Sequence, residues 1–232
     1  MEELAYLNSL NAREGLQWVS RRFTQVRFST SLGEEDQAIT HLIASMQLPV
    51  QIFTLDTGRL FQESYDLLHL TRQHYNIPLQ VYFPNTEQVE NYVQQNGVNG
   101  FYNSVENRKQ CCHIRKVVPL QRALQGAEVW VTGLRQSQSA NRGTMQRAVW
   151  DAEYKLIKYN PIVDWTDTQL HDFIEMNKIP INVLHKKGYP SIGCAPCTRA
   201  IMPGEDVRAG RWWWESSAKE CGLHATVIKQ NA

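Results

Sequence analysis

The chain has 232 residues, of which 42% are hydrophobic and 20% are charged, and its formal net charge is +1. These values are typical of one soluble globular domain with a modest appendage, and they argue against bulk binding to nucleic acid or to an anionic membrane. No apolar run approaches the ~20 residues that span a bilayer. The acidic start, Met1 to Ala5, lacks the features of a signal peptide, so we expect a cytoplasmic protein. Thiols stay reduced there, which favours ligand or catalytic roles for the five cysteines.

Strand and helix patterns alternate along the first two-thirds of the chain. Short apolar stretches predict strands at 26–29, 49–54, 79–83, 128–133 and 155–158. Amphipathic stretches predict helices at 12–23, 39–46, 61–75, 86–95 and 111–125, and another that begins within 164–167. Pro119 either interrupts the helix over 111–125 or begins a new turn. This alternation predicts an α/β fold in which helices flank both faces of a parallel sheet.

The last third of the chain differs in composition. Residues 135–147 are polar and predict a mobile loop that carries three arginines, among them Arg142. Pro, Gly and Cys are frequent from Pro180 onward, which predicts an irregular segment that needs a metal to hold it. We therefore expect one α/β domain over 1–202, which includes the cysteine-rich site, and a mobile C-terminal tail over 203–232.

The segment from Ser29 to Asp36 joins a predicted strand to a predicted helix. Backbone N–H groups and the positive end of the helix point at the sheet edge there, which suits phosphate or sulfate. Serine and threonine hydroxyls add donors, and Gly33 allows close backbone approach. The alternative is a plain helix cap, in which Ser31 and Glu34 form a capping box. The next strand ends in Leu55–Arg59 at the same edge, which favours the functional interpretation of both turns.

Four of the cysteines form two close pairs. Cys194-Ala195-Pro196-Cys197 is a tight chelating turn, and Cys111-Cys112 can hardly form a disulfide without strain. Together the pairs supply four thiolates, which suit zinc or a 4Fe–4S cluster. The alternative is that Cys111 or Cys112 is only a small buried hydrophobic residue. Three cations flank the pairs and fit a site that must offset negative charge: Arg115, Lys116 and Arg199.

The fifth cysteine, Cys221, stands eleven residues from the end of the chain. Lys219 and His224 are close to it in sequence, and each can stabilise a thiolate that a mobile tail carries into a pocket and out again. Arg208 and Arg211 precede it and can bring cationic cover for an anionic substrate. The alternatives are an incidental surface cysteine and a solvent-facing His224.

Six segments in combination resemble a known family and span most of the chain. They are Ser29–Asp36, Leu55–Arg59, Arg108–Lys116, Gly133–Arg135, Gly188–Arg199 and Lys219–His224. The chain resembles the assimilatory adenylyl-sulfate (APS) reductases of the thioredoxin-dependent, iron–sulfur type. This resemblance implies a nucleotide-binding fold of the adenine nucleotide α-hydrolase type, related to ATP pyrophosphatases. It also implies reduction of adenosine 5'-phosphosulfate to sulfite and AMP in sulfate assimilation and cysteine biosynthesis.

The resemblance assigns roles to particular residues. The implied ligands of a 4Fe–4S cluster are Cys111, Cys112, Cys194 and Cys197. The implied nucleophile is Cys221, which would form an S-sulfocysteine that thioredoxin, or a glutaredoxin-like donor, resolves. The implied cationic sulfate contacts are Lys116, Arg208, Arg211 and His224. The implied nucleotide contacts are Ser29, Ser31, Leu32, Gly33, Asp36, Leu55, Thr57, Gly133 and Arg142. A homo-oligomer is compatible with the sequence, which does not fix the oligomeric state.

Three other functions compete with this interpretation. A reductase of the 3'-phosphorylated substrate (PAPS), or of both substrates, is the nearest, but the phospho-specific enzymes usually lack the cysteine pairs that this chain has. An ATP-pyrophosphatase-type sulfurtransferase would have Ser-Gly-Gly-x-Asp-Ser at the first turn, where this chain has Ser-Leu-Gly-Glu-Glu-Asp. A zinc-binding adaptor without catalysis would leave the motif around Cys221 unexplained.

Overall fold

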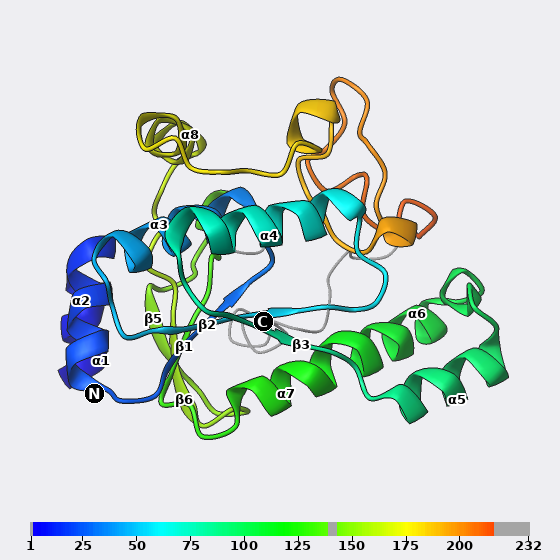
Figure 1. The fold of residues 1–232 in the computed structure, drawn as a ribbon, viewed down its shortest axis with the longest axis horizontal. Helices are drawn as coiled ribbons and strands as arrows, with labels where there is room; N and C mark the ends of the chain where they lie inside the picture. The colour runs from blue at the N-terminus through cyan, green and yellow to red at the C-terminus, as the bar shows by residue number, and fades with distance from the viewer. Residues whose placement is uncertain (1, 139–142, 216–232) are drawn as a thin grey trace.

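A mainly parallel sheet forms the centre of the molecule (Figure 1). The computed structural model describes residues 2–138 and 143–215. In this part of the chain the sheet has six strands in the order β3-β2-β1-β4-β6-β5, and only the edge pair β5–β6 is antiparallel. The strands are β1 (Val26–Thr30), β2 (Gln51–Leu55), β3 (Leu79–Tyr82), β4 (Val129–Val131), β5 (Ala148–Asp151) and β6 (Leu156–Tyr159). The predicted α/β class is therefore confirmed.

Helices cover both faces of this sheet, as predicted. Helices α3 and α4 lie on one side, and α6 and α7 lie on the other (Figure 1). The helices are α1 (Glu2–Ser9), α2 (Ala12–Arg22), α3 (Glu34–Ser45), α4 (Gln62–Tyr75), α5 (Thr86–Asn96), α6 (Val105–Cys112), α7 (Val118–Leu124) and α8 (Asp167–Met176). The chain order reverses between β1 and β4, which are neighbours in the sheet. Ligands of open parallel sheets bind at such a reversal, beyond the carboxyl ends of the strands.

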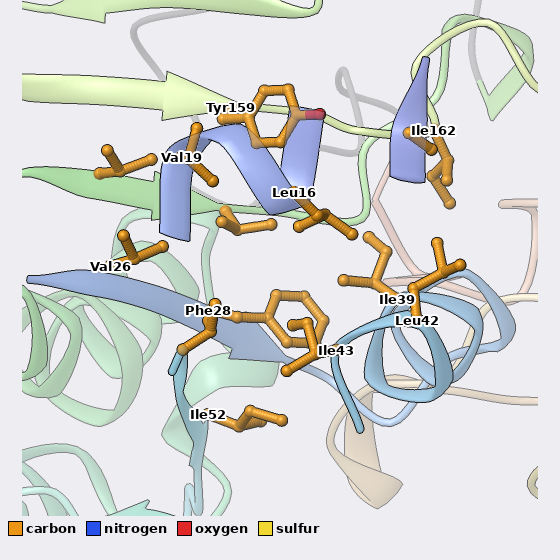
Figure 2. Close-up of a cluster of buried hydrophobic side chains, with 14 of the residues drawn as sticks. Leu16, Val19, Val26, Phe28, Ile39, Leu42, Ile43, Ile52, Tyr159 and Ile162 are labelled. Atoms are coloured by element: carbon orange, nitrogen blue, oxygen red, sulfur yellow. The ribbon is translucent and has the colours of Figure 1, made fainter. Parts of the chain in front are cut away.

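Alternation along the strands builds two apolar layers. Phe28 of β1 packs in the larger layer with Leu16 of α2 and Ile39 of α3 (Figure 2). Phe53 of β2 and Trp130 of β4 belong to the layer on the other face, together with residues of α7. Successive side chains of a strand point to opposite faces, so one strand serves both layers. This arrangement holds the carboxyl ends of β1, β2 and β4 rigidly in place.

Two elements at one edge of the sheet were not predicted. Helix α1 has a weak amphipathic pattern, yet Leu7 on it is fully buried. Strand β5 is short, and it pairs with β6 through the register Ala148 to Tyr159. Asn8 joins the two elements, because its side chain donates to the carbonyl of Ala148 and accepts from the amide of Ala148, at 3.0 and 2.9 Å. Contacts distant in sequence therefore create both elements.

Pro119 does not break the helix that contains it. Helix α6 begins at Val105, earlier than predicted, and continues through a π-helical segment, His113–Val117, into α7. Pro119 stands in the first turn of α7, directly after the π-helical segment in which the hydrogen-bond pattern of the helix changes. Single π turns inside α-helices often mark functional sites, and this one carries Arg115 and Lys116.

The first described residues of the predicted tail pack against the body of the molecule. Trp212 and Glu215 are both buried, and Thr198 forms an isolated antiparallel bridge with Arg211. The domain boundary after residue 202 stays a prediction, because 216–232 lie outside the described residues. Among the described helices, none combines the length and the apolar character needed to cross a membrane.

The larger apolar layer gives a prediction about stability. Replacement Phe28→Ala removes a fully buried ring from this layer and should lower the free energy of unfolding by about 3–5 kcal/mol. Phe83 is mostly exposed, so Phe83→Ala is a matched control that should change stability by about 0.5 kcal/mol or less. Urea denaturation followed by circular dichroism measures both. Equal losses in the two variants would contradict this assignment of the core.

Candidate active site and cysteine centre

The turn after β1 is held by a side-chain carboxylate. The backbone amide and the hydroxyl of Ser31 both donate to Oδ2 of Asp36, each at 2.6 Å. Leu32 takes a left-handed backbone conformation, with φ of 62°. The N-cap of α3 is Gly33, which makes no side-chain cap bond, so the alternative capping box of Ser31 with Glu34 is not formed. Asp36 therefore sets the shape of this turn.

Asp36 also lies against Gly133, which follows β4, at the reversal of the sheet. Burial raises the pKa of Asp36 to about 6, although hydrogen bonds from Ser31 oppose the shift. A Cβ atom on Gly133 would come within 2.1 Å of Oδ1 of Asp36, so only glycine fits there. Ser31, Gly33, Asp36 and Gly133, which we predicted as nucleotide contacts, thus lie together at one edge of the sheet.

Arg135 connects three segments at this edge of the sheet. Its guanidinium is almost fully buried and forms ion pairs with Glu35, at 2.7 Å, and with Asp167 at the start of α8, at 2.8 Å. It also donates to the carbonyl of Trp165 at 3.1 Å. The loop after β4, the first turn of α3 and the start of α8 are therefore tied to one side chain.

The turn after β2 joins the sheet edge to the cysteines. Oδ1 of Asp56 accepts from the amide of Gly58 at 2.7 Å and from the hydroxyl of Tyr65 at 3.0 Å, which fixes the turn. Thr57 Oγ1 lies 3.2 Å from Sγ of Cys194. The carbonyl of Thr57 accepts from Arg115 at 2.6 Å. Of the two contacts predicted here, Thr57 stands beside the cysteine centre, whereas Leu55, the last residue of β2, packs against the apolar layer of Phe53 and Trp130.

The four paired cysteines line one cavity between α6 and the loop that contains Cys194 and Cys197. The same cavity is lined by Phe101, Pro196 and four cations, which are Arg59, Arg108, Arg115 and Lys116. Ala195 holds the Cys194–Cys197 turn against the β2 turn, because its amide donates to the carbonyl of Arg59 at 2.8 Å. Within 2–138 and 143–215, no group of three or more His, Cys, Asp or Glu residues is arranged to hold a single metal ion.

Burial disfavours negative charge on these thiols. It raises the pKa of Cys111, although the guanidinium of Arg115 acts in the opposite direction. It raises the pKa of Cys197 to about 12, and the nearby Cys194 adds to this shift while Lys116 reduces it. Burial therefore disfavours the thiolate forms of Cys111 and Cys197 when no metal is bound. Metal binding to thiols releases their protons, so a bound metal would supply the missing compensation.

The arginines near the end of the described chain differ in burial and in hydrogen-bond partners. Arg211 is buried and donates to the carbonyl of Ile192 at 3.3 Å. Arg208 is half-buried in the turn that precedes it. Arg199, which we expected to offset charge at the cysteines, pairs instead with Glu205 at 2.8 Å. Lys116 lines the cysteine cavity, and its contact with the sulfate stays a prediction.

Three predicted site residues lie outside the described residues, so their roles stay predictions: Arg142, Cys221 and His224. The structure adds residues that sequence reasoning missed. Asp56 fixes the β2 turn, and its place in Leu55–Arg59 was the available signal. Arg108 forms a buried ion pair with Glu215. Glu215 stands outside every motif, so no local pattern pointed to it.

Comparisons with known proteins agree with this geometry. A family model described as the phosphoadenosine phosphosulfate reductase domain matches residues 25–200. The adenosine 5'-phosphosulfate reductase of Allochromatium vinosum is 50% identical over 214 residues, which cover 92% of this chain and 84% of that protein. The protein of the same name from Agrobacterium fabrum is 48% identical over 227 residues, which cover 97% of this chain and 87% of that protein.

Solved structures support the same placement. The phosphoadenylyl-sulfate reductase of Candida auris, in a phosphate complex, has a TM-score of 0.74 and 27% identity, and the match covers 86% of this chain and 97% of that chain. The FMN adenylyltransferase of Candida glabrata has a TM-score of 0.56, covers 94% of this chain and 72% of that chain, and shows the fold alone, since identity is 13%. From the family model and these relatives, the chain belongs to the phosphoadenosine phosphosulfate reductase domain family.

Proposed function

We propose that this protein reduces adenosine 5'-phosphosulfate to sulfite and AMP, with thioredoxin as the electron donor, in assimilatory sulfate reduction. The observation that carries the proposal is the 3.2 Å contact between Thr57 and Cys194, which joins the nucleotide edge to the cysteine centre. Relatives that are about half identical carry the name adenosine 5'-phosphosulfate reductase. An edge suited to an anionic nucleotide beside four thiols fits that chemistry.

The nucleotide would bind across the reversal between β1 and β4. The β1 turn and the N-terminus of α3 offer backbone N–H groups to a phosphate. The close approach of Gly133 to Asp36 keeps this edge free of side chains where the adenosine would lie. The sulfate group would then point toward the β2 turn, because Thr57 joins that turn to the cysteines.

The four cavity cysteines would hold a 4Fe–4S cluster. The donor set fits this group, because four thiols share one cavity and the guanidinium and ammonium groups around them can offset a cluster's negative charge. The cluster would supply structure and electrostatics and would not exchange electrons with substrate. Lys116 stands between the thiols and the nucleotide edge in this scheme, and its ammonium would stabilise the sulfate.

The reaction would proceed in three displacements on sulfur. The thiolate of Cys221 attacks the sulfate sulfur, an S–S bond forms, and the S–O bond to AMP breaks with its electron pair leaving on AMP. A thioredoxin thiolate then attacks Sγ of Cys221, and sulfite leaves with the electron pair of the S–S bond. The second thioredoxin thiol attacks the mixed disulfide and restores Cys221. Sulfur gains two electrons, which thioredoxin supplies as it is oxidised to its disulfide.

The 3'-phosphorylated nucleotide is the second candidate substrate. The family model and the Candida auris neighbour both carry the phosphosulfate reductase name. The phospho-specific enzymes usually lack the two cysteine pairs, and both pairs line the cavity of this chain. APS is therefore the substrate that we propose.

Mass spectrometry can test the nucleophile and the substrate together. On mixing with APS and no reductant, the wild-type protein should gain one sulfite-sized adduct, and peptide mapping should locate it on Cys221. Cys221→Ser should form no adduct and release no sulfite, yet bind AMP normally. A parallel reaction with PAPS should be slower. An adduct on another residue, or turnover by Cys221→Ser, would overturn the mechanism.

Iron and acid-labile sulfide analysis tests the cofactor. Cys194→Ser, purified without oxygen, should lose most of its iron, because a hydroxyl is a poor substitute for a thiolate ligand. It should also unfold at lower temperature, since the segment around it loses its metal. Cys221→Ser is the matched control and should keep the wild-type iron content. Zinc without iron in the wild-type protein, or full iron occupancy in Cys194→Ser, would refute the cluster.

Binding of AMP tests the nucleotide edge. Gly133→Ala places a methyl group against Asp36 and should weaken AMP binding about tenfold or more, because packed sites resist added volume. Gln125→Ala, near the other end of β4, is the control and should bind AMP normally. Isothermal titration calorimetry measures both affinities. Normal affinity in Gly133→Ala would place the nucleotide elsewhere.

A further inference from the structure

A buried ion pair joins the wall of the cysteine cavity to the last described residue of the chain. Arg108 donates from Nε and from Nη2 to the two carboxylate oxygens of Glu215, at 2.9 and 2.8 Å. Both side chains are almost fully buried, with exposed fractions of 2% and 3%. The two residues stand 107 positions apart in the chain. Such a two-pronged pair fixes orientation as well as distance.

An aromatic ring completes this contact. The guanidinium of Arg108 lies 4.7 Å from the ring centre of Trp212, and that of Arg211 lies 4.8 Å from it. The amide of Trp212 donates to the carbonyl of Cys197 at 3.2 Å, and the amide of Glu215 donates to the carbonyl of Trp212 at 2.9 Å. Residues 212–215 are therefore held by the two walls of the cavity, one from α6 and one from the Cys194–Cys197 turn.

A buried ion pair is weak evidence for a role in stability. Burying two charges is costly, and apolar residues of similar volume often serve a folded protein as well. What an ion pair adds is a single defined register for the segments that it joins. The segment in question leads directly to Cys221, six residues after Glu215. Six residues span at most about 20 Å, so the position of Glu215 limits where the thiol can act.

We propose that Arg108 and Glu215 are positioning residues, which fix the start of the segment that delivers Cys221 to the sulfate. The proposal rests on the proposed function, because it takes Cys221 as the nucleophile. Arg108 lines the same cavity as the four cysteines, so the state of the cysteine centre would also be transmitted to the delivery of the nucleophile. Neither residue touches the reacting atoms in this scheme.

Kinetic dissection of Glu215→Gln tests the proposal on the cluster-loaded enzyme. The amide keeps the shape of the side chain and removes its charge. We expect the single-turnover rate of adduct formation on Cys221 to fall about tenfold or more, while AMP affinity and iron content stay at wild-type values. Glu205→Gln is the matched control, because it breaks the more exposed pair with Arg199 in the same segment, and it should leave the rate unchanged.

A second variant guards against simple misfolding. The replacement Glu215→Asp keeps the carboxylate charge and leaves Arg108 at the cavity wall, so the fold and the iron content should survive. Its shorter side chain loses the two-pronged contact with Arg108, so adduct formation should still fall, with normal AMP binding. Adduct formation at the wild-type rate in both variants would overturn the proposal, and so would parallel losses of AMP binding, iron and rate, because these indicate a purely structural role.

A measurement without chemistry separates this proposal from the proposed function. Arg211 is buried, so trypsin should cleave slowly after it in the wild-type protein and about tenfold faster in Glu215→Gln. Cleavage after the exposed Arg72 should not change. If the wild-type protein forms no adduct on Cys221, the proposed function fails. If trypsin cuts both proteins equally after Arg211, the anchoring role of Glu215 fails on its own.

Discussion

Four thiols, two of them buried, and an anionic substrate would have to share one wall of this protein, and that constraint orders the rest of the site. Burial disfavours the charged form of the thiols, as the raised pKa of Cys111 and Cys197 shows. Charge on a cluster or a phosphosulfate therefore needs nearby cations that are already desolvated and fixed. The contact between Thr57 and Cys194 places the two regions side by side. Arg115 touches both, because it donates to the carbonyl of Thr57 and lines the cysteine cavity.

The helix that carries Cys111 and Cys112 also supplies cations to the same cavity. Residues 111 and 115 are four apart, as are 112 and 116, so each thiol shares a helix face with a cation. The π-helical segment changes the helical phase between them, and all four side chains line the same cavity. The helix accommodates Pro119 in the first turn of α7, directly after the π-helical segment. The arginine and the lysine are thus presented by the backbone that presents the thiols.

The sequence predicted those elements and turns whose structure depends on residues close together in the chain. The strand at 26–29 and the helix at 12–23 follow from periodicity, and β1 and α2 match them within one residue. The turn at Ser29–Asp36 and the two cysteine pairs were visible because their chemistry is compact in sequence. Helix α1 and strand β5 were not visible, since Asn8 and Ala148 define each other across the fold. Glu215 was missed for the same reason, because its role depends on its buried ion pair with Arg108, which is distant in sequence.

The segments of the two regions alternate along the chain, so they cannot fold as separate units. The β2 turn is hydrogen-bonded to the Cys194–Cys197 turn through Arg59 and Ala195, and Arg115 of the π-helical segment donates to the carbonyl of Thr57. The amide of Trp212 in turn donates to the carbonyl of Cys197. A change in the cysteine centre is therefore carried by direct contacts to the end of β2, where the sulfate would lie, and to the start of the segment that leads to Cys221. A cluster that exchanged no electrons would still influence the reaction in this scheme, because the contacts that place both reactants start from its ligands.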